Sequence, residues 1–181
     1  MTRISILKRG DMNDEQGKVY DAVEAAGGPL GGPYWAYIRN PTLMRLAQEV
    51  SNCLRASDLS DRERQIAVLT VVRHWGGEYP WAVQVKASLA AGVDQEIVDA
   101  INARQTPKLS DPREKAAHEV AGELLAEHGL SDATYANAAK QFGEEELVAL
   151  VAVIGQFSMV CCTANAFDVT PPDAEPARLA D

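Results

Sequence analysis

The chain has 181 residues, a formal net charge of −9 at pH 7 and only 6% aromatic residues. This length can bury a core within one domain spanning residues 1–181, and the acidity argues against nucleic acid or an anionic membrane surface as a partner. A composition rich in Ala, Val, Leu and Glu favours helices over a β-sandwich or barrel. The three cysteines lack CxxC spacing, which indicates a reducing compartment. The N-terminus lacks an apolar run long enough for a signal peptide, so we expect a cytoplasmic protein.

The N-terminal part predicts two helices around a Gly/Pro-rich segment. Asn13 is a good N-cap for a helix running to about Ala26. Residues 28–40, GPLGGPYWAYIRN, are expected to form a loop in which Tyr34 and Trp35 either plug the core or cover a pocket. The Asn-Pro pair that follows begins a second helix, whose apolar positions recur at helical spacing: Leu43, Leu46, Ala47, Val50 and Leu54.

The stretch from Ser60 to Val93 predicts two helices separated by a tight break. Ser60 and Glu63 have the spacing of a capping box. The turns that follow are apolar on nearly every face, which predicts a helix buried by several neighbours. Two glycines end it, and a second helix follows with an inward stripe of Trp81, Val85 and Leu89.

The C-terminal half predicts four more helices. The first follows Asp94, and the others cover about 111–128, 131–142 and 144–166. A Pro-rich polar tail, about 170–181, is expected to be mobile. Because no strand-like alternation occurs, we predict an all-α bundle of seven or eight helices.

The final predicted helix requires a membrane check. Residues 147–167 carry no charge and are long enough to span a bilayer. Their polar side chains would be costly in hydrocarbon, so burial in a core or a subunit interface is the better interpretation. Aligning Ile66 with Val148 also matches apolar positions between the first central helix and this one. The match indicates either a pseudo-duplicated bundle or chance agreement.

Three motifs in the central stretch support a family resemblance. They are the Ser-Asp-Arg-Glu-Arg start, the Trp-Gly-Gly-Glu-Tyr-x-Trp junction and the Ala-Gly-Val-x-x-Glu-Ile exit. Together they resemble the carboxymuconolactone decarboxylase family, whose superfamily includes the AhpD-like alkylhydroperoxidases, most strongly over about residues 43–105. The resemblance implies an AhpD-like all-α fold and a homo-oligomer, commonly a trimer or hexamer, with pockets near subunit contacts.

The chain departs from that family's catalytic motifs. Peroxidase members carry a Glu, a Cys-x-x-Cys and a His, where this chain has Gln65, Gly77, Pro80 and Gln84. Peroxidase chemistry needs two thiols able to form a disulfide, and Cys161 and Cys162 are poorly placed for that as neighbours in a helix. Decarboxylase-like members often have an acid and a His at the positions of Pro80 and Gln84.

The candidate catalytic residues lie at the helix junction. His74 is the only imidazole there and is either an acid/base or a histidine stabilised by the helix dipole. Glu78 is either a catalytic carboxylate or a solvated one. Gln84 stands where the family has its His and can orient a substrate, although its amide does not titrate near neutral pH. Tyr79 is the fourth candidate, and the case for it rests on the family resemblance.

A second group of residues is expected to bind or cover the substrate: Trp81, Tyr34, Trp35, Arg73, Cys161 and Asn165. An arginine suits a carboxylate substrate, although ion pairs at the surface or at an interface are the alternative. No cluster has metal-ligand spacing and no phosphate-binding loop occurs, so we expect neither a metal nor another cofactor.

Three functions remain open. The first, narrowly preferred, is a cofactor-independent lyase or isomerase acting on a small carboxylated or lactone-like molecule. The second is the thiol-peroxidase activity that the family would suggest, against which the missing cysteine pair argues. The third is a non-catalytic oligomer that binds a small molecule.

Overall fold

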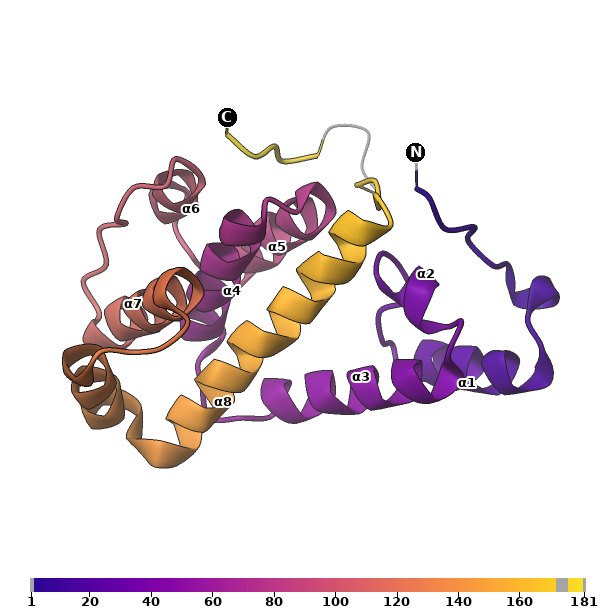
Figure 1. The fold of residues 1–181 in the computed structure, drawn as a ribbon, viewed down its shortest axis with the longest axis horizontal. Helices are drawn as coiled ribbons and strands as arrows, with labels where there is room; N and C mark the ends of the chain where they lie inside the picture. Colours follow the sequence, from indigo (N-terminus) through magenta and orange to yellow (C-terminus); the bar gives the residue numbers. More distant parts are fainter. Residues whose placement is uncertain (1, 172–175, 181) are drawn as a thin grey trace.

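The computed structural model describes residues 2–171 and 176–180. Over these residues it is helical and contains no strand, which confirms the predicted all-α fold (Figure 1). A 3-10 turn at Arg9–Asp11 precedes eight α-helices: α1 (Asp14–Ala25), α2 (Tyr34–Tyr37), α3 (Pro41–Arg55), α4 (Asp61–Trp75), α5 (Glu78–Ala90), α6 (Gln95–Asn102), α7 (Pro112–Glu127) and α8 (Asp132–Ala166).

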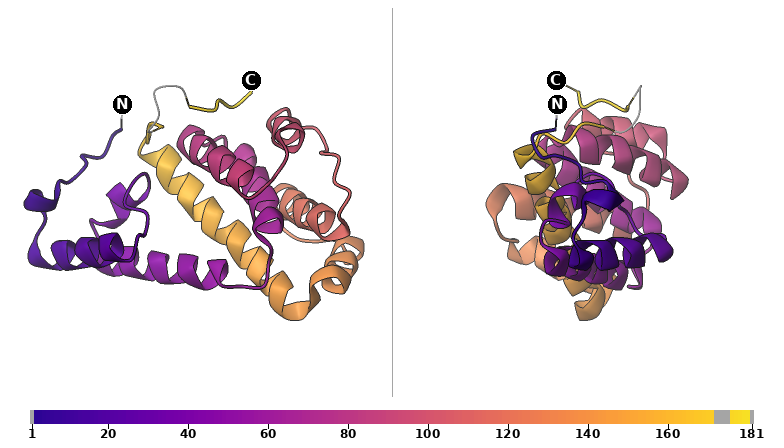
Figure 2. Two further views of the ribbon diagram at one scale, coloured as in Figure 1. Left: turned by 180° about the vertical axis from the view of Figure 1, so that it is seen from behind. Right: turned by 90° about the vertical axis from the view of Figure 1, so that its right-hand side faces the viewer.

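The helices form two groups on either side of α8. Helices α4, α5 and α7 pack along one side of it, and α3 approaches the other side with α1 and α2 packed on it. Figure 1 shows α8 running diagonally between the groups, and the view from behind in Figure 2 shows the same order. Each group has its own hydrophobic cluster. Tyr37 connects them, because its hydroxyl lies 3.1 Å from Thr163 Oγ1 on α8.

Helix α4 lies at the centre of the larger group. The predicted capping box at Ser60 and Glu63 is present, and Gly76 ends the helix with a left-handed φ of 63°. The apolar residues in between have no exposed surface: Ile66, Ala67, Val68, Leu69, Val71 and Val72 are each 0% exposed. The prediction of a helix covered on several sides is therefore confirmed.

A partly buried ionic cluster joins α4, α7 and α8. Arg113 on α7 donates Nε to the carboxylate of Glu63 and Nη2 to that of Glu146. Its guanidinium also lies 4.7 Å from the centre of the Phe142 ring. Burial alone would raise the pKa of Glu63, but hydrogen bonds from Arg113 and the Ser60 backbone bring it below its usual value. The carboxylate is therefore ionised at neutral pH, as the cluster requires.

Two boundaries differ from the sequence-based prediction. The helices expected over 131–142 and 144–166 join into one helix, α8, with a kink at Gly143, where φ is 70° and ψ is −177°. Glycine tolerates this backbone, so the chain bends without a loop. Within the loop expected over 28–40, Tyr34–Tyr37 forms one short helical turn.

The apolar stripe predicted for α3 is buried only in part, at Ala47 and Leu54. Leu43, Leu46 and Val50 are 40%, 45% and 48% exposed, whereas Met44 is 1% exposed. The outer side of α8 is similarly apolar, with Val148 at 69% exposed. Its proposed repeat partner Ile66 is fully buried, whereas Val72 and Ile154, another pair of the proposed repeat, are both buried, so the burial pattern follows the repeat only in part.

Helix α8 is the one helix in the described part of the chain that is long and apolar enough to cross a membrane. Of its most apolar window, 33% is buried inside the structure. A single such helix is weak evidence for a membrane protein, because the core helix of a soluble protein passes the same test. Its packing against α4 and α7 agrees with the core position expected from the sequence.

The expected mobile tail, about 170–181, lies partly outside the described residues. Residues 176–180 make specific contacts: the Arg178 carbonyl accepts hydrogen bonds from Trp81 Nε1 and Asn102 Nδ2. Leu179 packs against the main core. This part of the tail is thus attached to α5 and α6.

We predict that the exposed apolar faces of α3 and α8 are buried between copies of this chain, because such contiguous patches are rare on monomers. Val148→Glu should shift the mass measured by light scattering toward the 19.6 kDa of one chain. Lys140→Glu, also exposed on α8 but before the kink, should leave the assembly intact. A monomeric wild-type protein at working concentration would contradict this prediction.

Candidate functional site

A pocket of about 400 Å³ opens between α5, α8 and the segment that joins α1 to α3. We call it the tyrosine pocket. It is lined by Gly27, Pro29, Gly31, Pro33, Tyr34, Ser51, Arg55, Tyr79, Pro80, Val83, Gln84, Gln156, Phe157 and Val160. An apolar wall with a few convergent polar groups is the usual character of a small-molecule site.

Tyr34 and two residues of α3 form one side of the pocket. Ser51 and Arg55 both lie close enough to the Tyr34 hydroxyl to favour its ionised form. Burial raises the pKa of Tyr34, although both neighbours act in the opposite direction. Tyr34 is therefore a neutral hydrogen-bonding phenol at pH 7, beside the exposed guanidinium of Arg55.

Tyr79 on α5 also lines the pocket, and glycines make room for its ring. A Cβ at Gly32 would lie 2.2 Å from Tyr79 Cε1, and one at Gly31 would lie 3.2 Å from its hydroxyl. Gly32 also has a left-handed φ of 64°. The Trp35 ring lies 6.2 Å from the Tyr79 ring. Burial, and secondarily Tyr34, raises the pKa of Tyr79, so it too is neutral at pH 7.

Two amides complete the polar lining. Gln84 on α5 and Gln156 on α8 are both partly exposed within the pocket. No residue in the described part of the chain hydrogen-bonds the Gln84 amide, which leaves it available to a ligand. One turn further along α5, the fully buried Ser88 donates to Gln65 Oε1 at 3.1 Å.

Gly77 and Pro80, which the family resemblance aligns with the two peroxidase cysteines, lie next to each other in this fold. A Cβ at Gly77 would lie 3.1 Å from the Pro80 ring and 3.3 Å from Asn165 Oδ1. The chain's own thiols lie elsewhere: Cys53 and Cys162 are exposed, and Cys161 is buried. Burial raises the pKa of Cys161 to about 12, which keeps that thiol protonated and unreactive.

The structure brings three of the predicted site residues together: Tyr34, Tyr79 and Gln84. His74 is exposed at the end of α4 and lines a different hollow, and Glu78 is exposed outside the pocket lining. The two residues therefore do not meet Gln84 as the sequence-based hypothesis requires.

The other predicted binding residues have structural contacts. Trp81 is 1% exposed and donates Nε1 to the tail. Trp35 packs beside Tyr79 but lines a small neighbouring hollow. Asn165 donates to the Trp75 carbonyl at the end of α4. Arg73 belongs to the same hollow as His74, and Cys161 does not line the tyrosine pocket.

Sequence reasoning missed three polar residues of the pocket: Ser51, Arg55 and Gln156. Ser51 and Arg55 have the i, i+4 spacing that places two side chains on one helix face, but only tertiary packing shows what that face meets. Gln156 was visible as an unusual amide within an uncharged helix. Among the described residues, no group of three His, Cys, Asp or Glu side chains is placed to hold a metal ion.

Several solved structures share this fold. The AhpD-core, peroxidase-related protein from Ralstonia eutropha JMP134 is 15% identical, with a TM-score of 0.76 over 95% of this chain and 93% of its own. A peroxidase-related protein from Silicibacter sp. TM1040 is 19% identical, with a TM-score of 0.76 over 96% and 92%. The debrominase Bmp8 C82A, solved with 2,3,4-tribromopyrrole, is also 19% identical, with a TM-score of 0.76 over 96% and 93%.

No family model matches the sequence, and no curated protein matches it. At these identities the structural likeness establishes the fold. The chain therefore has the AhpD-like helical fold predicted from its central motifs.

We predict that Gly32→Ala disrupts the tyrosine pocket, because the added methyl group would collide with the Tyr79 ring. Gly27→Ala is the matched control, since Gly27 has a similar φ of 66° but nothing within 4 Å of an added Cβ. The control should lose about 1–2 kcal/mol in urea unfolding from backbone strain. Gly32→Ala should lose about 1–3 kcal/mol more and change the near-UV circular dichroism. Equal losses would show that Tyr79 moves aside freely.

Proposed function

We propose that the tyrosine pocket binds a small, mostly apolar molecule bearing a carboxylate, and that the protein acts on it as a cofactor-independent lyase. The observation that carries this proposal is the combination of Arg55 with two neutral tyrosine hydroxyls in one pocket. A guanidinium recognises a carboxylate through paired, charge-assisted hydrogen bonds. The hydroxyls supply further donors without competing negative charge.

The lining favours one class of reaction over the others. Its described residues include no Asp, Glu or His, so they offer no ordinary general base for removing a proton from carbon. Decarboxylation needs none, because the electron pair of the breaking C–C bond moves into the substrate as carbon dioxide leaves. If a carbonyl is conjugated to that carbon, the charge develops on its oxygen.

Tyr34 and Tyr79 suit the stabilisation of that oxygen. Neutral donors aimed at developing negative charge in a water-poor site are an effective form of catalysis. Arg55 would anchor a second carboxylate or a lactone oxygen that is retained, and Gln84 would orient the substrate. Protonation of the carbanion by a tyrosine hydroxyl or water completes the reaction without a change of redox state.

The same base-free lining also supports a second candidate, a non-catalytic member that only binds its ligand. A ligand that binds stoichiometrically and is recovered unchanged would favour that alternative. We further propose a cytoplasmic homo-oligomer without a nucleic-acid or membrane partner, based on the reduced cysteines, the acidity and the exposed apolar faces of α3 and α8.

Benzoate is a suitable first probe because benzamide has nearly the same shape without the charge. We expect benzoate to bind more tightly in calorimetry. Arg55→Gln should weaken benzoate binding about ten- to a hundredfold, which corresponds to the loss of a charge-assisted hydrogen bond of about 1.5–3 kcal/mol. Tyr79→Phe should weaken it by a smaller factor. Arg45→Gln, an exposed arginine of α3 outside this pocket, should have no effect. Equal binding of benzamide, or insensitivity to Arg55→Gln, would rule out this pocket as a carboxylate site.

We also predict no thiol-dependent peroxidase turnover. Cumene hydroperoxide with a dithiol reductant should be consumed no faster than without protein, because Gly77 and Pro80 occupy the thiol positions. The triple variant Cys53→Ser, Cys161→Ala, Cys162→Ser serves as the control. Turnover by the wild type that is lost in this variant would overturn the prediction.

A further inference from the structure

A second hollow, of about 200 Å³, is lined by other elements than the tyrosine pocket. It is enclosed by α4, the end of α6, the connector that follows α6, and α7. We call it the α4–α7 hollow. Its lining is Thr70, Arg73, His74, Ile101, Arg104, Gln105, Thr106, His118, Gly122 and Leu125. None of these residues lines the tyrosine pocket.

The charge of this hollow is opposite to that of the chain. Among the residues that the structure describes, two arginines and two histidines line it and no Asp or Glu does, although the net charge is −9. Its remaining polar groups are two threonines and one glutamine, of which Thr106 and Gln105 can donate hydrogen bonds to a ligand. In an acidic protein, a concave site with this composition concentrates anions.

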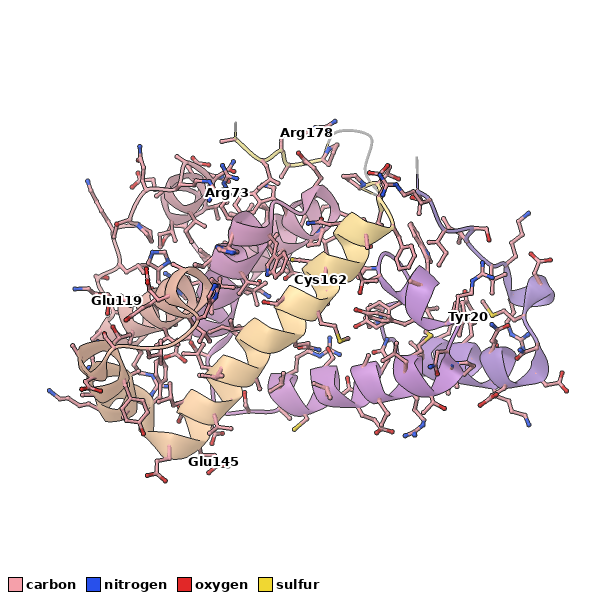
Figure 3. The ribbon with its side chains drawn as sticks, in the orientation of Figure 1. Tyr20, Arg73, Glu119, Glu145, Cys162 and Arg178 are labelled. Atoms are coloured by element: carbon pink, nitrogen blue, oxygen red, sulfur yellow. The ribbon has the colours of Figure 1, made fainter. Side chains whose placement is uncertain are left out.

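Arg73 is the most constrained of these residues. It is 7% exposed and donates Nε to the Asn102 carbonyl at 2.6 Å and Nη2 to the Ala180 carbonyl at 2.8 Å. Figure 3 shows Arg73 below the C-terminal segment that carries Arg178. Both acceptors are neutral, and no carboxylate in the described part of the chain forms an ion pair with Arg73. Burying a guanidinium is costly, and the two carbonyls that accept from it carry no full negative charge, so an anion beside it would be stabilising.

The electrostatics of Arg73 lead to the same conclusion. Burial and the neighbouring Arg104 both lower its pKa, and Glu78 opposes them more weakly. Two guanidiniums thus lie close enough to repel each other across the hollow. An oxyanion between them would turn this repulsion into attraction.

Arg104 has a backbone conformation that its local structure does not favour. It follows the C-cap of α6 with a left-handed φ of 56°, where glycine is the usual residue. Gln105 N closes that helix end by donating to the Ala100 carbonyl at 2.8 Å. Glycine would adopt this conformation with less strain, so the turn does not require an arginine. The Arg104 side chain adds a second positive charge to the hollow.

Thr70 and His118 form the floor of the hollow. Thr70 Oγ1 donates to the Ile66 carbonyl at 2.8 Å and lies 3.0 Å from His118 Nδ1. Because the hydroxyl has one proton and uses it on Ile66, His118 Nδ1 is the donor of the second bond. The imidazole is thereby held in one orientation against the hollow.

We infer that the α4–α7 hollow is a binding site for a small oxyanion, a phosphate or a short carboxylate, held chiefly by Arg73 and Arg104. The volume suits an anion of this size, and the two arginines supply the planar donors that phosphate and carboxylate oxygens accept. This site is separate from the tyrosine pocket and does not depend on the function proposed for it.

Histidine ring NMR signals provide the test, because the chain has three histidines. His74 and His118 line the hollow, whereas His128 lies at the C-cap of α7 and outside it. Inorganic phosphate, added at constant ionic strength and pH, should shift the His74 and His118 signals with saturation and leave His128 unchanged. Parallel titrations with acetate and succinate distinguish carboxylate from phosphate as the preferred anion.

Arg104→Gln should weaken binding of the preferred anion at least tenfold, because it removes one of the two guanidiniums. Arg104 is exposed, so the substitution leaves the core unchanged. Arg45→Gln, the same substitution on α3, should bind as the wild type does. Circular dichroism checks that both variants are folded. Unsaturable shifts, equal shifts of all three histidines, or unchanged affinity in Arg104→Gln would each overturn the inference.

Discussion

The burial of α4 is the constraint on which the rest of this fold depends. A helix that is apolar on all faces needs neighbours on all sides, and α5, α6, α7 and α8 supply them. Burying its apolar side chains contributes roughly 1.5–3 kcal/mol for each large residue. Apolar burial does not fix how the helices are oriented, but the Arg113 cluster does. It connects the start of α4 to α7 and to the part of α8 just beyond the Gly143 kink.

Both candidate sites follow from where α4 ends. Gly76 stops the helix in a left-handed conformation, and α5 begins two residues later. That reversal presents Tyr79 and Gln84 to α8 and the N-terminal group, which forms the tyrosine pocket. On α4 itself, the last turn carries Arg73 and His74 toward α6 and α7 instead. One helix end thus separates residues that are neighbours in sequence into two chemically different hollows.

This separation explains how far the sequence could predict the site. Caps, glycine stops and the apolar run of α4 are local signals, so most of the helices were predicted correctly, whereas the AhpD-like fold was implied by the resemblance of the central motifs. The direction in which each junction residue points depends on long-range packing. His74 and Gln84 are close in sequence, yet they face different hollows because they lie on different helices across the break.

Helix α3 also shows that a sequence pattern does not determine which face of a helix is buried. Its leucine and valine stripe suggested an inward face, but the structure buries Met44 and Gln48 and exposes Leu46 and Val50. Gln48 Nε2 donates to the Pro29 carbonyl, which satisfies a polar group inside the small group of helices. Amphipathic spacing identifies an apolar face but does not say whether the chain itself or a second copy covers it.

The adjacency of Gly77 and Pro80 suggests how the chemistry of such a scaffold can change while its shape remains. The helix start that could hold two thiols now holds a residue without a side chain and one without an N–H group. Neither can carry electrons or protons, and Asn165 occupies the space beside them. The polar groups that remain nearby are hydroxyls and amides. Their usefulness lies in donating hydrogen bonds to a substrate oxygen, so a reaction that develops negative charge there suits the remaining residues better than redox exchange.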